Sequence, residues 1–301
     1  MHPLIALALC SVVLAGCVGS EPSLILEPDP ARDGLEGRDG PWGAARYEER
    51  SLARVDEALR YEVTYPADAQ GAVAPTEGDD LPIVVMIHGG FVEVERYRWL
   101  GRHLASRGYV TLMADHDANL SLLASNNSDA ALDDLLDESL DPTHPLVGRL
   151  PPEPAAAVLG HSLGGVSAAV LWADDPDRWG VLGILASFPA ADTDVERFTG
   201  RPTVHLVGSE DEPEAKREQG FERFAAPRVF GVVGGMNHYA WTDDATAAEL
   251  RTDGAATRAV DSTRLDAQHV LDTCLDAWMK DDSTAAAHLD DGVFSGIELS
   301  R

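Results

Sequence analysis

The chain has 301 residues, with 51 Asp or Glu against 23 Lys or Arg, so its formal net charge is −28. Hydrophobic residues make up 45% of the sequence, which is enough for a folded core and excludes wholesale disorder. A general nucleic-acid binder is excluded, because phosphate backbones require clustered Lys and Arg. The same charge disfavours adsorption of the folded body to anionic lipid head groups.

Residues 1–16 are expected to form a signal peptide. The apolar run from Leu4 to Leu14 is too short to span a bilayer as a helix, and it leads into Leu14-Ala15-Gly16-Cys17. This ending resembles the lipobox of bacterial lipoproteins, which implies cleavage before Cys17 and attachment of lipid to that residue. We therefore expect a cell-envelope protein that is attached to the membrane through Cys17 alone, with Val18 favouring the outer membrane. Because the first three residues lack Lys and Arg, an ordinary secretory peptide and a secreted protein are the alternative.

Three polar stretches follow. Residues 17–40 are rich in Pro, Gly, Asp and Glu, which is typical of a flexible tether. Residues 67–80 interrupt the apolar pattern and predict a hairpin or loop. The main domain is expected over residues 41–282, and residues 283–301 are expected to form a polar, loosely attached tail.

Cysteine usage predicts no internal disulfide. Cys10 leaves with the signal peptide and Cys17 takes lipid, so Cys274 remains alone. It lies in an apolar-periodic helical segment at 262–280, and we expect it to be buried and unreactive.

Within the main domain, short apolar runs alternate with helical patterns. Such continuous apolar runs are typical of parallel strands that are buried on both faces. The alternation predicts a doubly wound, mostly parallel sheet flanked by helices, with functional sites beyond the carboxyl ends of its strands. The strands are expected at 83–87, 109–113, 156–159, 181–185, 203–207 and 229–233, and the helices at 93–107, 163–174, 214–226 and 262–280.

The segment Gly160-His161-Ser162-Leu163-Gly164-Gly165 follows one of these strands and opens a helix. It has the G-x-S-x-G pattern of a nucleophile elbow in the strand-turn-helix context that this motif requires. Glycines on both sides allow the sharp, strained turn that exposes the serine. Ser162 is therefore the candidate nucleophile.

Two further strand ends carry the residue types that activate a serine. Glu210, Asp211 and Glu212 follow the strand at 203–207, where a carboxylate can be held rigidly enough to orient a histidine. His238 follows the strand at 229–233, and histidine has the proton affinity that a general base needs near neutral pH.

The tripeptide Asp115-His116-Asp117 also follows a strand and contains metal-ligating residue types. No second His or Cys cluster in the sequence supplies the missing ligands. We therefore expect no metal and no cofactor, and interpret the tripeptide as bracing a loop or lining the rim of a pocket.

Together these motifs make the chain similar to α/β-hydrolases of the dienelactone hydrolase, chlorophyllase, platelet-activating-factor acetylhydrolase and cutinase-like polyesterase group. His88-Gly89-Gly90 and the elbow carry the resemblance, with Gly40-Pro41-Trp42, Tyr65-Pro66-Ala67 and the segment from Leu275 to Asp281 pointing to this branch. Two features depart from it. The carboxy-terminal Cys pair of many secreted polyester hydrolases is absent, and Ser162 stands where typical dienelactone hydrolases have Cys.

The resemblance implies an α/β-hydrolase fold and a triad in the chain order Ser162, Asp211, His238. Asp211 is chosen because its position after Gly208 matches the family's G-x-x-D turn, with Glu210 as the fallback. The oxyanion hole is expected to consist of the backbone N–H groups of Leu163 and of Gly90 or Phe91. His88 is expected to brace the same loop.

These residues predict ester hydrolysis through an acyl-enzyme, on a small-molecule or polymeric ester and with no nucleic-acid partner. The interval between Ser162 and Asp211 leaves no room for a large lid, so we expect an open groove. Four aromatic residues near the motifs are candidates either to line an acyl or alcohol pocket or to pack in the core: Phe91, Phe188, Tyr239 and Trp241. The alternatives are another triad enzyme, such as a peptidase, a haloperoxidase-like enzyme or an acyltransferase, and a non-catalytic surface lipoprotein with the same fold.

Overall fold

The computed structural model describes residues 25–26, 40–51, 59–74, 80–115, 121–151, 155–196, 200–211 and 220–301. The expected signal peptide, the lipidation site Cys17 and most of the expected tether lie outside the described residues, as do His116, Asp117 and Glu212. Every helix in the described part of the chain is too short or too polar to traverse a lipid bilayer.

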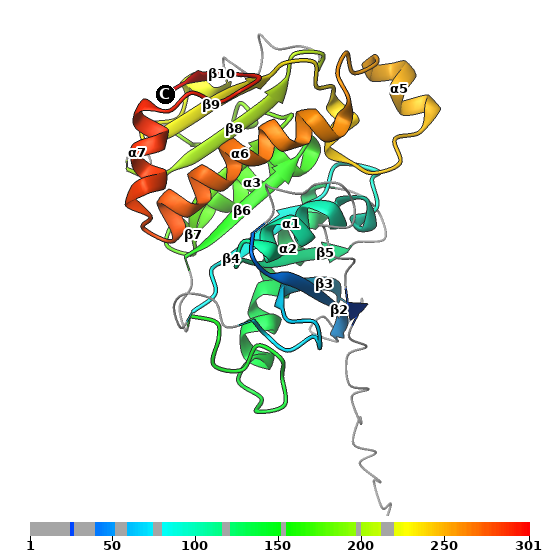
Figure 1. The fold of residues 1–301 in the computed structure, drawn as a ribbon, viewed down its shortest axis with the longest axis vertical. Helices are drawn as coiled ribbons and strands as arrows, with labels where there is room; N and C mark the ends of the chain where they lie inside the picture. The colour runs from blue at the N-terminus through cyan, green and yellow to red at the C-terminus, as the bar shows by residue number, and fades with distance from the viewer. Residues whose placement is uncertain are drawn as a thin grey trace, which may run out of the picture.

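A single sheet runs through the molecule (Figure 1), and its ten described strands follow the order β1-β2-β3-β5-β4-β6-β7-β8-β9-β10. The six neighbouring strands from β5 to β9 are parallel, whereas β1, β2, β3 and β10 pair antiparallel. This is the mostly parallel, helix-flanked sheet that the sequence predicts. The strands are β1 (Ile25–Leu26), β2 (Gly43–Ser51), β3 (Leu59–Ala67), β4 (Ile83–Ile87), β5 (Val110–Asp115), β6 (Ala156–His161), β7 (Trp179–Leu185), β8 (Thr203–Gly208), β9 (Arg228–Val233) and β10 (Ile297–Ser300).

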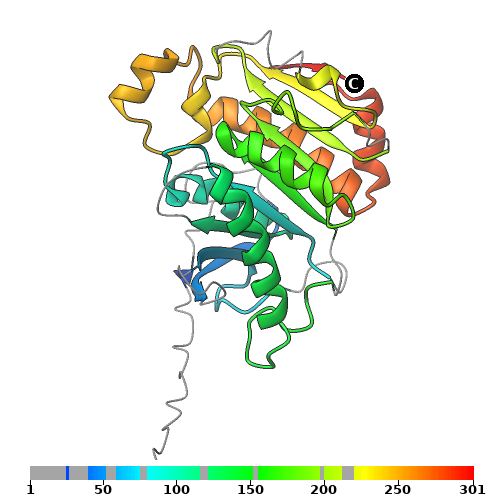
Figure 2. The same cartoon turned by 180° about the vertical axis from the view of Figure 1, so that it is seen from behind.

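Helices cover both faces of the sheet. Helices α1, α6 and α7 lie on the face turned toward the viewer in Figure 1, and α2 and α3 lie on the face seen in Figure 2. Between β7 and β8, the described residues form neither helix nor strand, so no large lid is inserted there. The helical elements are η2 (Val94–Tyr97), α1 (Arg98–Ser106), α2 (Ser121–Glu138), α3 (Leu163–Asp174), η3 (His238–Trp241), α5 (Ala247–Asp253), α6 (Val260–Met279) and α7 (Ser283–Asp291).

The central strands bury apolar side chains on both faces. In β4, Val84 and Met86 belong to the core beneath α1 and α6, whereas Val85 and Ile87 belong to the core beneath α2 and α3. This follows from the twofold alternation of side chains along a strand. Two cores of this kind explain why the parallel strands are apolar throughout their length.

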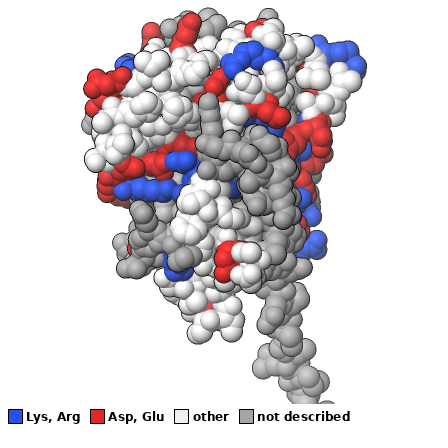
Figure 3. All heavy atoms as spheres, viewed as in Figure 1, with Lys and Arg blue, Asp and Glu red and all other residues white. Residues whose placement is uncertain are grey.

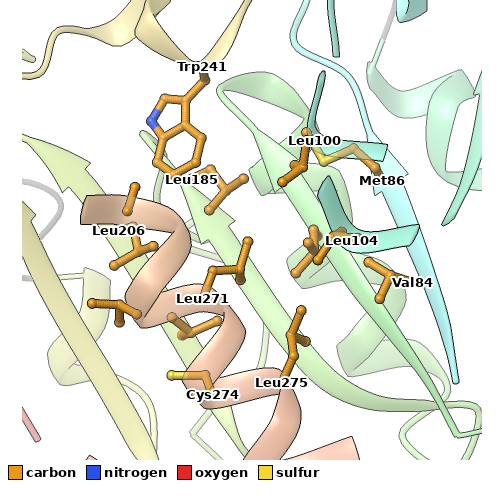
Figure 4. Packing of buried hydrophobic residues seen from close by; sticks show 14 of the residues in the cluster. Val84, Met86, Leu100, Leu104, Leu185, Leu206, Trp241, Leu271, Cys274 and Leu275 are labelled. Atoms are coloured by element: carbon orange, nitrogen blue, oxygen red, sulfur yellow. The ribbon is translucent and has the colours of Figure 1, made fainter. Parts of the chain in front are cut away.

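The α6 side of the sheet contains Cys274. Figure 4 shows its side chain beside Leu271 and Leu275, in the layer where α6 packs on the sheet. Cys274 is fully buried, and burial raises the pKa of its thiol well above the ordinary value. The prediction of a buried cysteine in a helix is confirmed, and a thiol held in this protonated state is a poor nucleophile.

Residues 283–301 differ from the loosely attached tail that we expected. Helix α7 packs against α6, and β10 pairs with β9 from Ile297 opposite Val233 to Ser300 opposite Phe230. Leu289 and Phe294 are buried in the core beneath α6. The sequence is polar here because only one side of this edge segment meets the core, so few apolar residues suffice.

Charge is spread over the surface. On the face drawn in Figure 3, Asp and Glu side chains lie at several separate places, often with Lys or Arg beside them. The excess of acidic residues therefore does not form one continuous patch on this face.

Candidate active site

Four predicted motifs meet at one edge of the sheet. Strands β4, β6, β8 and β9 are parallel, so their carboxyl ends lie at the same edge. His88 follows β4, Ser162 follows β6, Asp211 lies just beyond β8, and His238 follows β9. Parallel topology therefore gathers residues that are far apart in the sequence, at the edge where α/β sheets place their sites.

Ser162 lies on a strained turn between β6 and α3, with φ 55° and ψ −123°. The chain is so crowded here that a Cβ atom on Gly160 would lie 2.1 Å from the carbonyl oxygen of Gly164. A Cβ atom on Gly164 would lie 2.3 Å from the carbonyl oxygen of Ile87. The two flanking glycines are thus required by close backbone approach, and the strained conformation is the kind that persists at functional sites.

Asp211 and His238 form a hydrogen bond of 3.0 Å between the carboxylate Oδ1 and the ring Nδ1. The Asp211 side chain is 1% exposed and that of His238 is 18% exposed. A carboxylate on Nδ1 selects the tautomer that carries its proton there, which leaves Nε2 as the basic nitrogen. This is the arrangement that a general base requires.

Glu210, the fallback acid, points elsewhere. Its Oε1 accepts hydrogen bonds from the hydroxyls of Ser209, at 3.2 Å, and Thr257, at 3.0 Å. Among the described carboxylates of this loop, Asp211 is therefore the one that orients His238.

His161 links the elbow to the loop of His238. The two imidazole rings lie 4.7 Å apart between centroids, and His161 Nε2 is 3.1 Å from the backbone oxygen of His238. Because a carbonyl oxygen only accepts, Nε2 donates here, and Nδ1 is left as an acceptor. Ser162, the next residue, is thus held beside the segment that carries His238.

Tyr97 extends this network to the loop after β4. Its buried hydroxyl lies 2.8 Å from His161 Nδ1 and accepts a 2.9 Å hydrogen bond from Gly89 N–H. Burial raises the pKa of the Tyr97 phenol, so it remains a donor to His161. The sequence did not identify Tyr97, because nothing in its local pattern distinguishes it from an ordinary helix residue.

The expected oxyanion loop packs against the start of α3. A Cβ atom on Gly90 would lie 2.5 Å from Leu163 Cδ1, and Phe91 has φ 61°. Leu163 is the first residue of α3, where backbone N–H groups have no acceptor within the helix and the helix dipole favours negative charge. His88 Nδ1 lies 2.8 Å from the Gly89 oxygen, and burial lowers the pKa of His88, so it braces the loop as a neutral ring.

Exposed apolar side chains surround the elbow. Phe91 is 72% exposed, Leu163 46% and Phe188 37%, and Phe188 adjoins Ser187, whose hydroxyl donates to the Ser162 carbonyl. For Trp241 the sequence left two roles open, lining a pocket or packing in the core. It is 1% exposed and packs against Trp99, so it belongs to the core.

A third carboxylate lies at this edge. One oxygen of Asp211, one oxygen of Asp253 and one ring nitrogen of His238 all lie within 4.8 Å of one another, which is compact enough for a metal ion. A metal on Nδ1 would have to replace the proton shared with Asp211, and the Asp253 carboxylate already accepts hydrogen bonds from the backbone. We interpret the group as a hydrogen-bonding network.

The other candidate for metal ligation lies apart from this network. Asp115 ends β5 and forms an ion pair with Arg60 on β3. Its neighbours His116 and Asp117 lie outside the described residues. The described part of this tripeptide thus ties two strands together.

A family model described as the alpha/beta hydrolase family matches residues 83–259, which is more than half of the chain and extends from β4 to the start of α6. No curated protein matches the chain.

Proposed function

The chain belongs to the alpha/beta hydrolase family, and we propose that it is a serine hydrolase that cleaves carboxylic esters through an acyl-enzyme. Family membership supports hydrolase activity. The observation that carries the finer proposal is the Asp211–His238 hydrogen bond, which forms at the sheet edge where the strained elbow carries Ser162.

In the acylation step, Ser162 Oγ attacks the ester carbonyl carbon while His238 Nε2 takes the hydroxyl proton. Asp211, bonded to Nδ1, orients the ring and stabilises its cationic form. The backbone N–H groups of Leu163 and of Gly90 or Phe91 stabilise the negative charge on the carbonyl oxygen. The C–O bond of the ester then breaks, and His238 returns the proton to the leaving alcohol.

Deacylation repeats these steps with water. His238 takes a proton from the water molecule, whose oxygen attacks the acyl carbon, and the proton then returns to Ser162 Oγ as the acid leaves. No cofactor enters either half of the reaction.

The surroundings of the elbow favour an uncharged ester with an apolar group. The exposed side chains of Phe91, Leu163 and Phe188 offer apolar contact area, and the net charge of −28 repels anionic substrates at low ionic strength. On the motifs quoted above, we propose that the chain belongs to the dienelactone hydrolase, chlorophyllase, platelet-activating-factor acetylhydrolase and cutinase-like polyesterase group.

The proposal is tested by Ser162→Ala. We expect hydrolysis of p-nitrophenyl acetate to fall by about 10³-fold or more while the circular dichroism spectrum and the melting temperature stay close to those of the wild type. A fluorophosphonate probe is expected to label the wild type at Ser162 and to leave the variant unlabelled. Unchanged hydrolysis by Ser162→Ala would refute the assignment, and absence of labelling would favour a non-catalytic lipoprotein.

A substrate panel separates ester hydrolysis from the other triad chemistries. Esters of increasing acyl length, a polyester film and a set of peptides are compared by kcat/KM. Peptide cleavage that exceeds ester cleavage, or acyl transfer to an added alcohol that exceeds hydrolysis, would replace the proposal by a peptidase or an acyltransferase.

We further propose that lipid on Cys17 anchors the protein in the cell envelope, with the outer membrane favoured. The lipobox supports this location. Cys17→Ser is expected to abolish labelling by a palmitate analogue and to release the protein from the membrane fraction. Secretion of the unsubstituted protein without lipid would show that the alternative is right.

A further inference from the structure

The short helix α5 ends beside the loop that carries His238. Three hydrogen bonds join the two segments: from His238 N–H to Asp253 Oδ2 at 2.6 Å, from Tyr239 N–H to the same oxygen at 3.3 Å, and from Asn237 Nδ2 to the Gly254 carbonyl at 2.9 Å. Asn237 is buried, and Asp253 is the last residue of α5. The backbone of the proposed base is thus held by a residue that lies 15 positions after it in the chain.

The Asp253 carboxylate occupies the position of a helix cap. His238 and Tyr239 are the first residues of η3, whose own N-cap residue, Asn237, makes no side-chain cap hydrogen bond. N–H groups in a first helical turn need outside acceptors, and a carboxylate is a favoured one. The same carboxylate has an oxygen within 4.8 Å of a His238 ring nitrogen, so its charge also acts on the ring.

Helix α5 is itself fixed to the body of the protein. Arg96 donates to both Glu249 oxygens, at 2.8 and 3.1 Å, and the Arg96 hydrogen bonds hold the pKa of Glu249 at about 2. Thr246 and Glu249 form a reciprocal capping box at the start of the helix. Because hydrogen bonds hold both ends of α5 against the body of the protein, the position of Asp253 is set by the scaffold and not by a free loop.

We propose that Asp253 is a positioning residue for His238, which fixes the backbone of the base and supplies a second negative charge that stabilises its protonated ring. The inference rests on the proposed function. Burial raises the pKa of the Asp253 carboxyl above its ordinary value, and the nearby Asp211 carboxylate acts in the same direction. The His238 ring and the backbone N–H groups of His238 and Tyr239 act in the opposite direction, because they favour the charged carboxylate.

The groups that face His238 are contributed by four elements. Asp211 lies beyond β8, His161 ends β6, Tyr239 lies next to His238 in η3, and Asp253 ends α5. Two cations contact the neighbouring backbone, Arg264 at the Ala240 oxygen and Arg96 at the Asp243 oxygen. Of the two carboxylates in this group, Asp253 is the one that accepts from the backbone of His238 and also lies near its ring.

The decisive variant is Asp253→Asn, because asparagine keeps a side-chain oxygen that can accept the two backbone hydrogen bonds and removes only the charge. We expect kcat to fall about tenfold with KM nearly unchanged, and the acidic limb of the pH–rate profile to move to lower pH by about half a unit or more, since the protonated ring loses a stabilising charge. Asp253→Ala also removes the acceptor and is expected to lower kcat by about a hundredfold.

Asp290→Asn, an exposed residue of α7 with the same change of charge, is the matched control and should leave rate and profile unchanged. If Asp253→Asn matches the wild type in rate and pH profile, the charge has no role and the proposal is overturned. The proposal also fails if Asp253→Ala is impaired and Asp253→Asn is fully active, because Asp253 is then only a structural cap.

A second readout does not depend on turnover. Nuclear magnetic resonance of the His238 ring, assigned with a His238→Gln variant, follows its protonation in the wild type and in Asp253→Asn. The midpoint is expected at lower pH in the variant, and identical midpoints would overturn the proposal. If the wild type hydrolyses no ester, the proposed function fails, whereas the midpoint shift still decides the role of Asp253.

Discussion

Two histidine–aspartate pairs differ in what surrounds them. His238 bonds to Asp211 at 3.0 Å, and His103 bonds to Asp272 at 2.9 Å, so the pairs themselves are nearly alike. His103 lies on α1 and is 2% exposed, whereas the His238 side chain lies beyond a strand end and is 18% exposed. The hydrogen bond alone therefore does not make a histidine a candidate base.

The charges around the pairs differ as well. Asp272 belongs to a group that we call the α1–α6 charge cluster, where carboxylates meet cations: Arg107 contacts both Asp272 and Asp276, and Lys280 contacts Asp276. At His238, the carboxylates of Asp211 and Asp253 converge on one imidazole. In the α1–α6 charge cluster, the pairs of opposite charge join two helices.

The two pairs also lie toward opposite edges of the sheet. The α1–α6 charge cluster borders a hollow of about 670 Å³ near the amino ends of β4 and β5, with Trp42 and Leu81 also lining it. His238 lies at the opposite, carboxyl edge, beside the elbow. Of the two pairs, only the one at the carboxyl edge has a strained serine next to it.

The largest difference between the pairs is expected on replacing each histidine. His238→Ala should lower kcat for an ester by about three to five orders of magnitude, because Ser162 loses its base. His103→Gln should leave kcat within about twofold and lower the free energy of unfolding instead. Steady-state kinetics and urea denaturation of both variants test this contrast. Equal losses of activity would show that the two pairs are not functionally distinct.

The next largest effect is expected at the acid. Asp211→Asn should lower kcat by about 10³- to 10⁴-fold, because an amide no longer selects the tautomer in which Nε2 is basic. Glu210→Gln, one residue away, should leave kcat nearly unchanged, since Glu210 bonds to Ser209 and Thr257. Kinetics at pH 8 compare the two variants. If Glu210→Gln is the more impaired, the acid has been misassigned.

The sequence predicted the central sheet because the parallel strands are buried on both faces and hence continuously apolar. It did not predict β2 and β3, in which Arg46 and Glu62 are buried as a cross-strand ion pair and interrupt the apolar pattern. Helix α2 was missed for a similar reason, since residues such as Ala131, Leu132 and Leu135 meet the core among many Asp and Asn. Buried charges in a strand, and a helix with only one apolar side, interrupt the apolar pattern from which strands and helices are predicted. The contacts in the structure show these elements all the same.

The candidate site likewise has features that the sequence predicted and features that it did not. The placement of Ser162, Asp211 and His238 at one edge of the sheet could be predicted, because each follows a strand and parallel topology brings the strand ends together. Tyr97, His161 and Asp253 could not be assigned roles, because their partners come from other segments: Tyr97 reaches His161 64 positions away, and Asp253 bonds to a residue 15 positions before it. A role that depends on a contact between distant segments of the chain produces no recognisable pattern in the local sequence.

The smallest effect on activity is expected in the α1–α6 charge cluster. Asp276 is 8% exposed and accepts hydrogen bonds from Arg107 at 2.6 Å, Tyr109 at 2.8 Å and Lys280 at 2.8 Å. Asp276→Asn should lower the free energy of unfolding at pH 7 by about 1–3 kcal/mol, because it removes the buried counter-charge of the partly exposed Arg107 and Lys280. kcat should not change, since the cluster lies at the edge opposite the elbow.

The pH dependence of this loss tests its electrostatic cause. Burial alone raises the pKa of the Asp276 carboxyl, but Lys280 and Arg107 hold it below its ordinary value of 3.8. A lowered pKa in the folded state contributes stability that is complete above the ordinary value and disappears as pH falls through the folded value. The gap in unfolding free energy between wild type and Asp276→Asn should therefore stay constant from about pH 8 to 5 and narrow below about pH 4. Urea denaturation at pH 7, 5 and 3.5 measures it, with Asp290→Asn as the exposed control; a gap of the same size at every pH would mean that Asp276 stabilises α6 by packing and not by charge.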